Sequence, residues 1–458
     1  MPLEHMQVAT VQPVSERREA GQALRKIVPR GVQAHWAPPP GRRDPVDILA
    51  ETGHHRIASL LPIRYDRMRA SPFAFFRGSA AIMAADLADT PVAGLWVQAC
   101  GDCHLANFGT FASPEGTPVF DVNDFDETLP APFEWDIKRL AASFAVDAQS
   151  RDLGDKAART LAAAAVQAYR RHMNELARLA PLESWRSRID VAAVVDGIGD
   201  PKLRARELRQ LQTALEAGHA GYPKLIERSK GQWRIKEKPP LIFPLSGQRD
   251  DTHEIVARTA FSSYTLSLPE ERRILLDRYE LADVAFKVVG VGSVGTFCAI
   301  GLFATRDDQT LLLQLKEAQT SVLAPFAGPS VYANQGQRVV VGQRIMQTVP
   351  DIFLGWTEDR GDDRQCYIRQ LKDSRLALIG TGLAEDALLY HAMLCGVTLA
   401  RAHARSGDPA RIAGYLGTSS AFDSAIAAFA LAYAVQTRAD WRLFRAAIDA
   451  GRIEARSG

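Results

Sequence analysis

Helix-forming and strand-forming stretches occupy separate blocks of this chain. Residues 135–217 and 385–453 have helical patterns. Between these blocks, Val284–Gly290, Thr296–Ala304 and Leu311–Lys316 are rich in β-branched and aromatic residues and are separated by Gly or Asp turns, which is typical of strands. Three such runs in succession predict an antiparallel meander. Helices and strands that are segregated in this way predict an α+β fold.

The β-rich block is long enough to form a lobe of its own. It also contains a predicted helix over residues 334–348 and two further predicted strands over residues 352–355 and 365–371. A chain of 458 residues is too long for one small domain. We therefore expect an N-terminal extension rich in Arg, Pro and Gly, a helical lobe, a small β lobe and C-terminal helices that pack on the helical lobe, over residues 1–45, 46–280, 281–375 and 376–458 respectively.

The composition is that of an ordinary globular protein. Hydrophobic residues make up 47% of the chain and charged residues 24%, which excludes a disordered polymer. The formal net charge of +2 argues against a protein that coats nucleic acid. There is no apolar run of about 18 residues for a membrane helix and no secretion signal at the N-terminus. Five cysteines suit a reducing compartment, so we expect a cytoplasmic protein without a membrane partner.

Two polar clusters each follow a short apolar strand. The segment Gly101–Phe108, GDCHLANF, comes after Leu95–Ala99, and the segment Asn123–Thr128, NDFDET, comes after Pro118–Val122. Carboxylates beside a buried strand are costly unless they have a partner, so such clusters usually indicate cation binding or catalysis. A single aspartate such as Asp102 could also be a turn or cap residue.

The spacing of these polar residues suits phosphoryl transfer. That reaction needs an acid to orient the acceptor hydroxyl, together with an amide and a carboxylate that hold Mg²⁺ against the phosphates. Asp102 and Asn107 stand five residues apart, and Asp124 and Asp126 follow the next strand. Mg²⁺ keeps several of its waters, so one Asn and one Asp are sufficient protein ligands.

A glycine-rich segment and an isolated lysine occur in the β-rich block. The string GVGSVG contains Gly290, Gly292, Ser293 and Gly295. Because a strand is predicted after it, the string does not fit a dinucleotide-binding fingerprint, which opens a helix. It fits a glycine loop that covers a nucleotide phosphate, or a plain β-turn. Lys316 ends an apolar strand, where it needs an anion such as an ATP phosphate or else reaches solvent from the strand edge.

The polar clusters resemble the catalytic half of a known superfamily. The runs GDCHLANFG, VFDVNDFDE and PFEWDIKRLAAS are similar to motifs of protein-kinase-like enzymes in the style of the aminoglycoside phosphotransferases. The whole chain also resembles the bacterial DUF2252 family of uncharacterised proteins. The superfamily resemblance implies that the cofactors are ATP and Mg²⁺ and that a nucleotide is bound between two lobes.

The resemblance also implies a role for each matching residue. The positions of the catalytic base, the loop histidine, the metal-binding amide and the metal-binding aspartate are Asp102, His104, Asn107 and Asp124, in that order. Asp126 or Asp121 could share or replace the role of the last of these. Lys316 matches the lysine that grips the α and β phosphates, and Asp136 matches an aspartate that braces the catalytic loop.

The order of these parts is inverted relative to the familiar kinases. There the glycine loop and the lysine precede the catalytic loop, whereas here Lys316 comes far behind Asp102. We therefore expect a circularly permuted, kinase-like two-lobe fold, since exposed joins of compact domains tolerate re-cutting. The lysine usually pairs with a glutamate on the next helix, but residues 334–348 contain no acid. Either an amide such as Gln337 or Gln343 serves, or the lysine is held differently, or the nucleotide is held weakly.

These features predict an ATP- and Mg²⁺-dependent phosphotransferase that acts on a hydroxyl of a small molecule or a protein. Transfer of AMP on the same fold is one alternative. A nucleotide-binding pseudokinase or regulatory module is another, because the helix glutamate is missing. A metal-dependent hydrolase that uses only the aspartates is a further alternative. Residues 149–250 contain no motif that identifies the acceptor.

Overall fold

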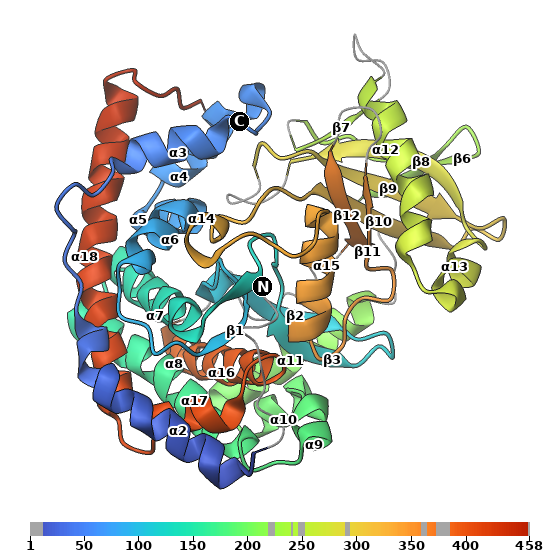
Figure 1. The fold of residues 1–458 in the computed structure, drawn as a ribbon. Coiled ribbons are helices and arrows are strands. Elements are labelled where there is room, and N and C mark those ends of the chain that lie inside the picture. The colour runs from blue at the N-terminus through green and yellow to red at the C-terminus, as the bar shows by residue number, and fades with distance from the viewer. Residues whose placement is uncertain are drawn as a thin grey trace.

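The computed structural model describes residues 12–218, 225–239, 241–245, 252–288, 294–358, 364–371 and 385–456. In this part of the chain, helices and strands are segregated into a helical lobe and a β lobe (Figure 1). The α+β class that the sequence predicts is confirmed.

The β lobe is built on a six-stranded antiparallel sheet. The strand order is β11–β12–β10–β9–β8–β7, and the bounds in chain order are Ile242–Pro244 (β7), Glu280–Lys287 (β8), Cys298–Ala304 (β9), Thr310–Glu317 (β10), Gly355–Glu358 (β11) and Gln365–Gln370 (β12). The predicted meander corresponds to β8, β9 and β10, and the predicted helix corresponds to α15 (Gln335–Met346). Leu311, Leu313 and Leu315 of β10 pack into one apolar core. Lys316 therefore lies on the opposite face of the strand.

The β lobe begins earlier in the chain than the predicted boundary at residue 281. β7 pairs with β8 at the edge of the sheet. Helices α12 (Thr252–Ser263) and α13 (Glu270–Leu276) contribute apolar side chains to the same core as β8 and β9. The hairpin of β5 (Ile226–Ser229) and β6 (Gln232–Ile235) also packs on the sheet through its apolar side chains. Local sequence pattern does not indicate which lobe this segment joins.

The helical lobe is organised around helix α7. This helix spans Phe133–Ser150, and residues 133–148 are all buried. It packs against α8 (Gly154–Leu176) and α18 (Ala421–Asp449), while α16 (Glu385–Ala404) packs on α8. Two short antiparallel pairs precede α7, namely β1 with β4 and β2 with β3, with the bounds Trp96–Ala99 (β1), Phe108–Ala112 (β2), Pro118–Val122 (β3) and Leu129–Pro132 (β4).

The described part of the N-terminal extension, residues 12–45, packs on the helical lobe. Helix α2 (Val14–Ile27) lies against α17 (Pro409–Leu416). Arg17 forms an ion pair with Asp408 at 2.9 Å. Arg25, Arg30 and Arg42 also find partners on α17 or α18, which composition alone did not indicate.

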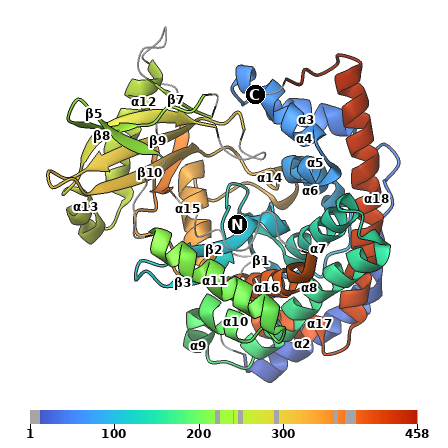
Figure 2. The ribbon, with the colours of Figure 1, turned by 180° about the vertical axis from the view of Figure 1, so that it is seen from behind.

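The remaining helices and 3-10 turns belong to the helical lobe or join the lobes, except for η4 (Tyr264–Ser267), whose Tyr264 packs in the core of the β lobe. Their bounds are Arg30–Ala34 (η1), Pro45–Gly53 (α3), Ala58–Leu60 (η2), Leu61–Arg69 (α4), Pro72–Gly78 (α5), Ala80–Ala88 (α6), Leu105–Asn107 (η3), Pro181–Arg186 (α9), Val191–Asp196 (α10), Pro201–Gly218 (α11), Tyr264–Ser267 (η4) and Ala324–Ala327 (α14). In both views, α3 to α6 lie between α18 and the β lobe (Figure 1 and Figure 2).

Within the described residues, no single helix combines the length and the apolar character needed to cross a bilayer. Helices α17 and α18 reach this length and apolar character only when they are taken together, and the pair is bent by 82°.

The close approach of α16 to α8 depends on Gly396. A Cβ atom at this position would lie 2.1 Å from the carbonyl oxygen of Ala165. We expect Gly396→Ala to lower the free energy of unfolding by about 1–3 kcal/mol because the helices must separate, although alanine normally favours a helix over glycine. Thermal unfolding followed by circular dichroism measures this effect. Gly31→Ala is the control, since nothing lies within 4 Å of a Cβ there; equal midpoints for all three proteins would contradict the close packing.

Candidate active site

The first turn of helix α7 holds the loop that contains Asp102. The carboxylate of Asp136 accepts hydrogen bonds from the backbone N–H groups of Cys100 at 2.6 Å and Gly101 at 3.0 Å. Nε2 of His403 on α16 lies 3.2 Å from the same carboxylate. Asp136 therefore fixes the backbone directly before Asp102, at the position that the resemblance assigns to bracing this loop.

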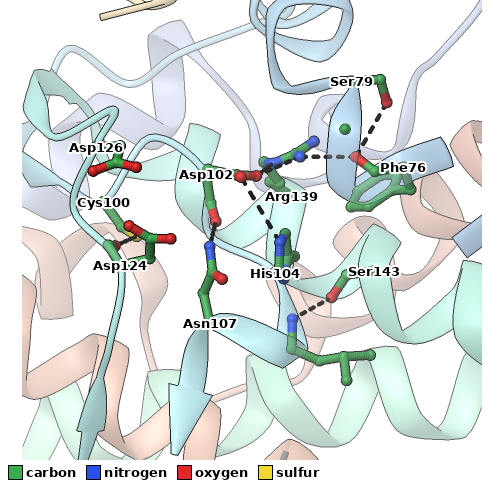
Figure 3. Close-up of polar contacts among 12 residues, drawn as sticks. Phe76, Ser79, Cys100, Asp102, His104, Asn107, Asp124, Asp126, Arg139 and Ser143 are labelled. Atoms are coloured by element: carbon green, nitrogen blue, oxygen red, sulfur yellow. Dashed lines mark hydrogen bonds and ion pairs between the residues drawn. The ribbon is translucent and has the colours of Figure 1, made fainter. Parts of the chain in front are cut away.

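Two further residues on the same face of α7 reach the loop. Ser143 accepts a hydrogen bond from the backbone N–H of Leu105 at 3.0 Å, and Nε of Arg139 donates to Oδ1 of Asp102 at 2.7 Å (Figure 3). Asp136, Arg139 and Ser143 are separated by three and four residues, so they share one helix face. This face orients the Asp102 carboxylate, and 18% of that side chain remains exposed to a reaction partner.

The two polar loops are in direct contact. Nδ2 of Asn107 donates to the backbone carbonyl of Asp102 at 2.8 Å (Figure 3), and the Asn107 carbonyl accepts from the backbone N–H of Asn123 at 2.7 Å. Gly101 has a φ of 82°, and a Cβ there would lie 2.4 Å from the carbonyl oxygen of Glu127. The absence of a side chain at Gly101 allows the loop of Asp102 to lie against the loop of Asp124 and Asp126.

His104 lies beside Asp102 but is not within hydrogen-bond distance of it. Its Nε2 is 3.7 Å from Oδ2 of Asp102, which is too far for a hydrogen bond. Burial, and next the charges of Arg77 and Arg139, hold the pKa of His104 well below its usual value. The imidazole is therefore neutral at pH 7, so it is placed to pack and position and not to carry charge.

Lysine 316 of the β lobe reaches the second polar loop. Nζ of Lys316 lies 2.7 Å from Oδ2 of Asp126 and 3.5 Å from Oδ1 of Asp124. Burial lowers the pKa of this lysine, but the two carboxylates outweigh burial and raise it well above its usual value. The hydroxyl of Tyr367 donates to Oδ1 of Asp126 at 2.5 Å. Two segments that are far apart in the sequence thus meet in one charged cluster.

Helix α15 supports this cluster with an arginine and not with a glutamate. Arg338 donates to the backbone carbonyls of Asp126 at 2.9 Å and Thr128 at 2.7 Å. Nε2 of Gln343 donates a hydrogen bond to Oε1 of Gln347, four residues later, at 2.8 Å. Of the possibilities that the sequence left open for Lys316, the described contacts agree with a lysine that is held differently, by Asp126 itself.

Asp121 does not belong to this cluster. Its Oδ1 accepts from the backbone N–H of Val122 at 2.9 Å and from the guanidinium of Arg401, and its Oδ2 accepts from the backbone N–H of Thr348 at 3.1 Å. The carboxylate is thus satisfied inside the core. Asp124 and Asp126, whose side chains are 34% and 27% exposed, are the accessible acids of this segment.

The glycine-rich segment can be placed only in part. Gly290, Gly292 and Ser293 lie outside the described residues. Gly295 has a φ of 93°, and its carbonyl accepts from the backbone N–H of Ile57 at 2.7 Å. A strand, β9, and not a helix follows the segment, as the sequence predicts.

A small cavity lies where these parts meet. Its volume is about 60 Å³. Four acids and three arginines contribute to its lining, namely Asp102, Asp124, Asp126, Glu127, Arg56, Arg64 and Arg77. Burial raises the pKa of Glu127 to about 7, although a hydrogen bond from Val322 and the charge of Arg338 oppose this shift.

Of the residues that the resemblance assigns to a metal, Asp124 and Asp126 line this cavity, whereas Asn107 does not. Within the described residues, no group of three or more His, Cys, Asp or Glu side chains could hold a metal. Asn107, Asp124 and Asp126 instead offer an amide and two carboxylates, and Mg²⁺ accepts so few protein ligands because it keeps its waters. Cys100 and Cys103 are buried and free, and burial raises the pKa of the Cys103 thiol well above its usual value, so this pair does not supply thiolate ligands.

Comparison with known proteins gave one family match. The model of the family described as "Uncharacterized protein conserved in bacteria (DUF2252)" matches residues 56–447. The chain belongs to the DUF2252 family. No curated protein matches the chain, and no solved structure matches it. The matched range of this DUF2252 chain includes every charged residue that lines the cavity.

The arginines of the DUF2252 site were not predicted from the sequence. Arg139 stands three residues after Asp136 in the segment PFEWDIKRLAAS, so helical spacing could have placed it beside the loop. Arg56, Arg64 and Arg77 come from the N-terminal helices, and no local pattern distinguishes them from surface arginines.

The pair of Lys316 and Asp126 should show energetic coupling. Lys316→Met leaves the carboxylates without their cation and Asp126→Asn weakens the anion around a buried ammonium, so each change should lower the free energy of unfolding by about 1–3 kcal/mol. The double variant should lose less than the sum, with a coupling of about 0.5 kcal/mol or more. Urea unfolding of the four proteins measures the coupling. The exposed pair of Arg69 and Asp66 is the control and should couple more weakly; additive losses at Lys316 and Asp126 would contradict the pairing.

His391 should make the support of the loop that contains Leu105 dependent on pH. Its Nε2 lies 2.9 Å from the carbonyl oxygen of Leu105, and burial lowers the pKa of the imidazole to about 4. The unfolded histidine has a pKa of about 6.5, so the unfolded state binds more protons between these values and stability should fall as pH falls through this window. The loss should reach at most about 3 kcal/mol.

Urea unfolding of the parent and of His391→Gln at about pH 7 and about pH 4.5 measures this contribution. The parent should lose more stability than the variant on acidification, because the glutamine does not titrate. Equal losses in the two proteins would show that His391 is not buried in its neutral form.

Proposed function

We propose that this DUF2252 protein is an ATP- and Mg²⁺-dependent phosphotransferase that transfers the γ-phosphoryl group to a hydroxyl of a small molecule or a protein. The contact of Lys316 with Asp124 and Asp126 carries the proposal. It joins a cation suited to nucleotide phosphates with acids suited to their counter-ion, one from each lobe. A kinase-like fold in permuted order is part of the proposal, and the late position of Lys316 in the chain supports it.

Asp102 is the proposed catalytic base. Arg139 holds its Oδ1, so the carboxylate keeps one orientation at the cavity, and the buried, neutral His104 positions it. In the transfer, the acceptor oxygen forms a bond to the γ-phosphorus and its proton passes to Asp102. The bond from phosphorus to the bridging oxygen breaks, and ADP leaves with the electron pair. A carboxylate that is already ion-paired suffices, because a loose transition state requires positioning more than strong proton abstraction.

Asn107, Asp124 and Asp126 are the proposed Mg²⁺ ligands. Burial alone would raise the pKa of Asp126, but the charge of Lys316 lowers it, so this carboxylate is ionised at neutral pH as a metal ligand must be. A bound Mg²⁺ neutralises charge on the phosphates. Lys316 supplies a second positive charge, and the segment from Gly290 to Gly295 is proposed to cover the phosphates.

Turnover of ATP by the full chain tests the proposal. Asp102→Asn should reduce ADP release by about 10²–10⁴-fold and leave the affinity for a non-hydrolysable ATP analogue with Mg²⁺ nearly unchanged, because the variant removes only the base. Lys316→Met should weaken that affinity by about tenfold or more, since it removes a charge-assisted contact to phosphate. Asp89→Asn and Lys156→Met remove exposed charges of the same kinds and serve as matched controls.

Two results would contradict the proposal. One is ADP release by Asp102→Asn at the parental rate, which would deny its role as the base. The other is the absence of any calorimetric signal with Mg²⁺ and the ATP analogue. Mass spectrometry of the products also separates phosphoryl transfer from AMP transfer, because an added adenylyl group is heavier than an added phosphoryl group.

A further inference from the structure

Three arginines from the N-terminal helices converge on the cavity beside Asp102. Arg56 precedes η2, Arg64 lies in α4 and Arg77 lies near the end of α5. All three line the same cavity as Asp102. Arg64 is only 2% exposed, and a guanidinium so deeply buried normally has an ionic partner.

The hydrogen bonds of these arginines leave donors unused. Arg64 donates through Nη2 to the carbonyl oxygen of Gly78 at 2.7 Å, and Arg56 donates through Nη1 to that of Val294 at 2.7 Å. In the described part of the chain, Nε and Nη1 of Arg64 and the Nε atoms of Arg56 and Arg77 are buried without a hydrogen-bond partner. Each unpaired buried donor costs free energy. Oxygen atoms of a bound ligand would accept hydrogen bonds from these N–H groups and remove this cost.

Three of the four acids across the cavity form ion pairs with cations other than these arginines. Asp102 is engaged by Arg139 at 2.7 Å, and Lys316 lies 2.7 Å from Asp126 and 3.5 Å from Asp124. The remaining acid, Glu127, accepts a hydrogen bond from the backbone N–H of Val322 at 2.7 Å. The basic side of the cavity therefore keeps an excess of positive charge.

The pKa values of all three arginines are lowered at this cavity. Burial, and next the charge of Arg56, lower the pKa of Arg64 to about 9. Burial also lowers the pKa of Arg56 and of Arg77, against the opposing charges of nearby acids. A bound anion would relieve this strain, because it offsets the repulsion between the guanidinium groups and satisfies their free N–H donors.

The size of the cavity limits what the arginines can take. A water molecule needs about 10–15 Å³ measured in the same way, so 60 Å³ accommodates a few waters or one small oxyanion. A guanidinium group binds phosphate or carboxylate oxygens through parallel N–H donors. Three such groups around one space offer more N–H donors than a planar carboxylate can use, and a phosphate has further oxygen atoms to accept them.

We infer that Arg56, Arg64 and Arg77 form an oxyanion-binding subsite that receives one phosphate group next to Asp102. The phosphate belongs either to the acceptor, which is then a phosphorylated compound, or to the end of the nucleotide. This choice of source rests on the proposed function, whereas the binding of phosphate itself does not. In either case, the subsite determines which atoms of the substrate lie beside Asp102.

Binding of inorganic phosphate to the full chain tests the subsite. Isothermal titration calorimetry and thermal unfolding should both detect phosphate, with sodium chloride at equal ionic strength as the reference. Arg64→Gln and Arg77→Gln should each weaken binding by about tenfold or more, because each removes a charge-assisted contact. Arg69→Gln, on the same helix as Arg64 but exposed and paired with Asp66, should bind phosphate as the parent does.

The subsite is overturned if phosphate has no more effect than chloride on the parent, or if both Arg64→Gln and Arg77→Gln bind it as the parent does. Arg77 is less buried than Arg64, so its variant decides the question if Arg64→Gln does not fold. Repeating the titration with Mg²⁺ and a non-hydrolysable ATP analogue identifies the source. Simultaneous binding assigns the subsite to the acceptor, and mutual exclusion assigns it to the nucleotide.

The same titrations separate this inference from the proposed function. Phosphate binding without any binding of the ATP analogue keeps the arginine subsite and contradicts the phosphotransferase. Binding of the analogue without phosphate binding, in a parent protein that turns over ATP, keeps the phosphotransferase and contradicts the subsite.

Discussion

Desolvation of one ammonium group governs how the two lobes meet. Lys316 ends an apolar strand, and its side chain is only 4% exposed, so burial of this charge is costly unless anions face it. Asp124 and Asp126 supply these anions from a loop of the other lobe. A buried ion pair adds little to stability compared with apolar packing, but it restricts which parts of two surfaces can face each other. The position of β10 against the loop after β3 is therefore set by charge.

In the helical lobe, a single helix, α7, holds the loop that contains Asp102. Asp136, Arg139 and Ser143 hold the loop of Asp102 through its backbone, its carboxylate and its following turn. Because α7 is buried from residue 133 to residue 148, these side chains have little freedom to reorient. Catalytic groups that are held in this way do not have to be reorganised during a reaction. A rigid acidic loop and a lysine that needs anions are thus complementary features of the two lobes.

Features that depend on local pattern could be predicted from the sequence. The meander β8–β9–β10, the helix α15 and the polar loops after β1 and β3 all follow from residue types and spacing. Partnerships between distant segments could not be predicted in the same way. Local pattern places Asp121 in a strand and Asp126 in the loop after it, but it does not indicate that Asp126 pairs with Lys316 and Asp121 with Arg401. For the same reason, the sequence did not indicate that α12 belongs to the β lobe or that the three arginines gather at one cavity. Hydropathy indicates that a residue is buried but not which residues it contacts.

The contact of Gly101 with the carbonyl of Glu127 has a mechanical consequence. With no side chain between them, the two loops lie in direct contact. Asp102 therefore cannot move without moving the loop that carries Asp124 and Asp126. The cavity of about 60 Å³ is far smaller than a nucleotide, so the proposed binding of ATP requires this space to enlarge.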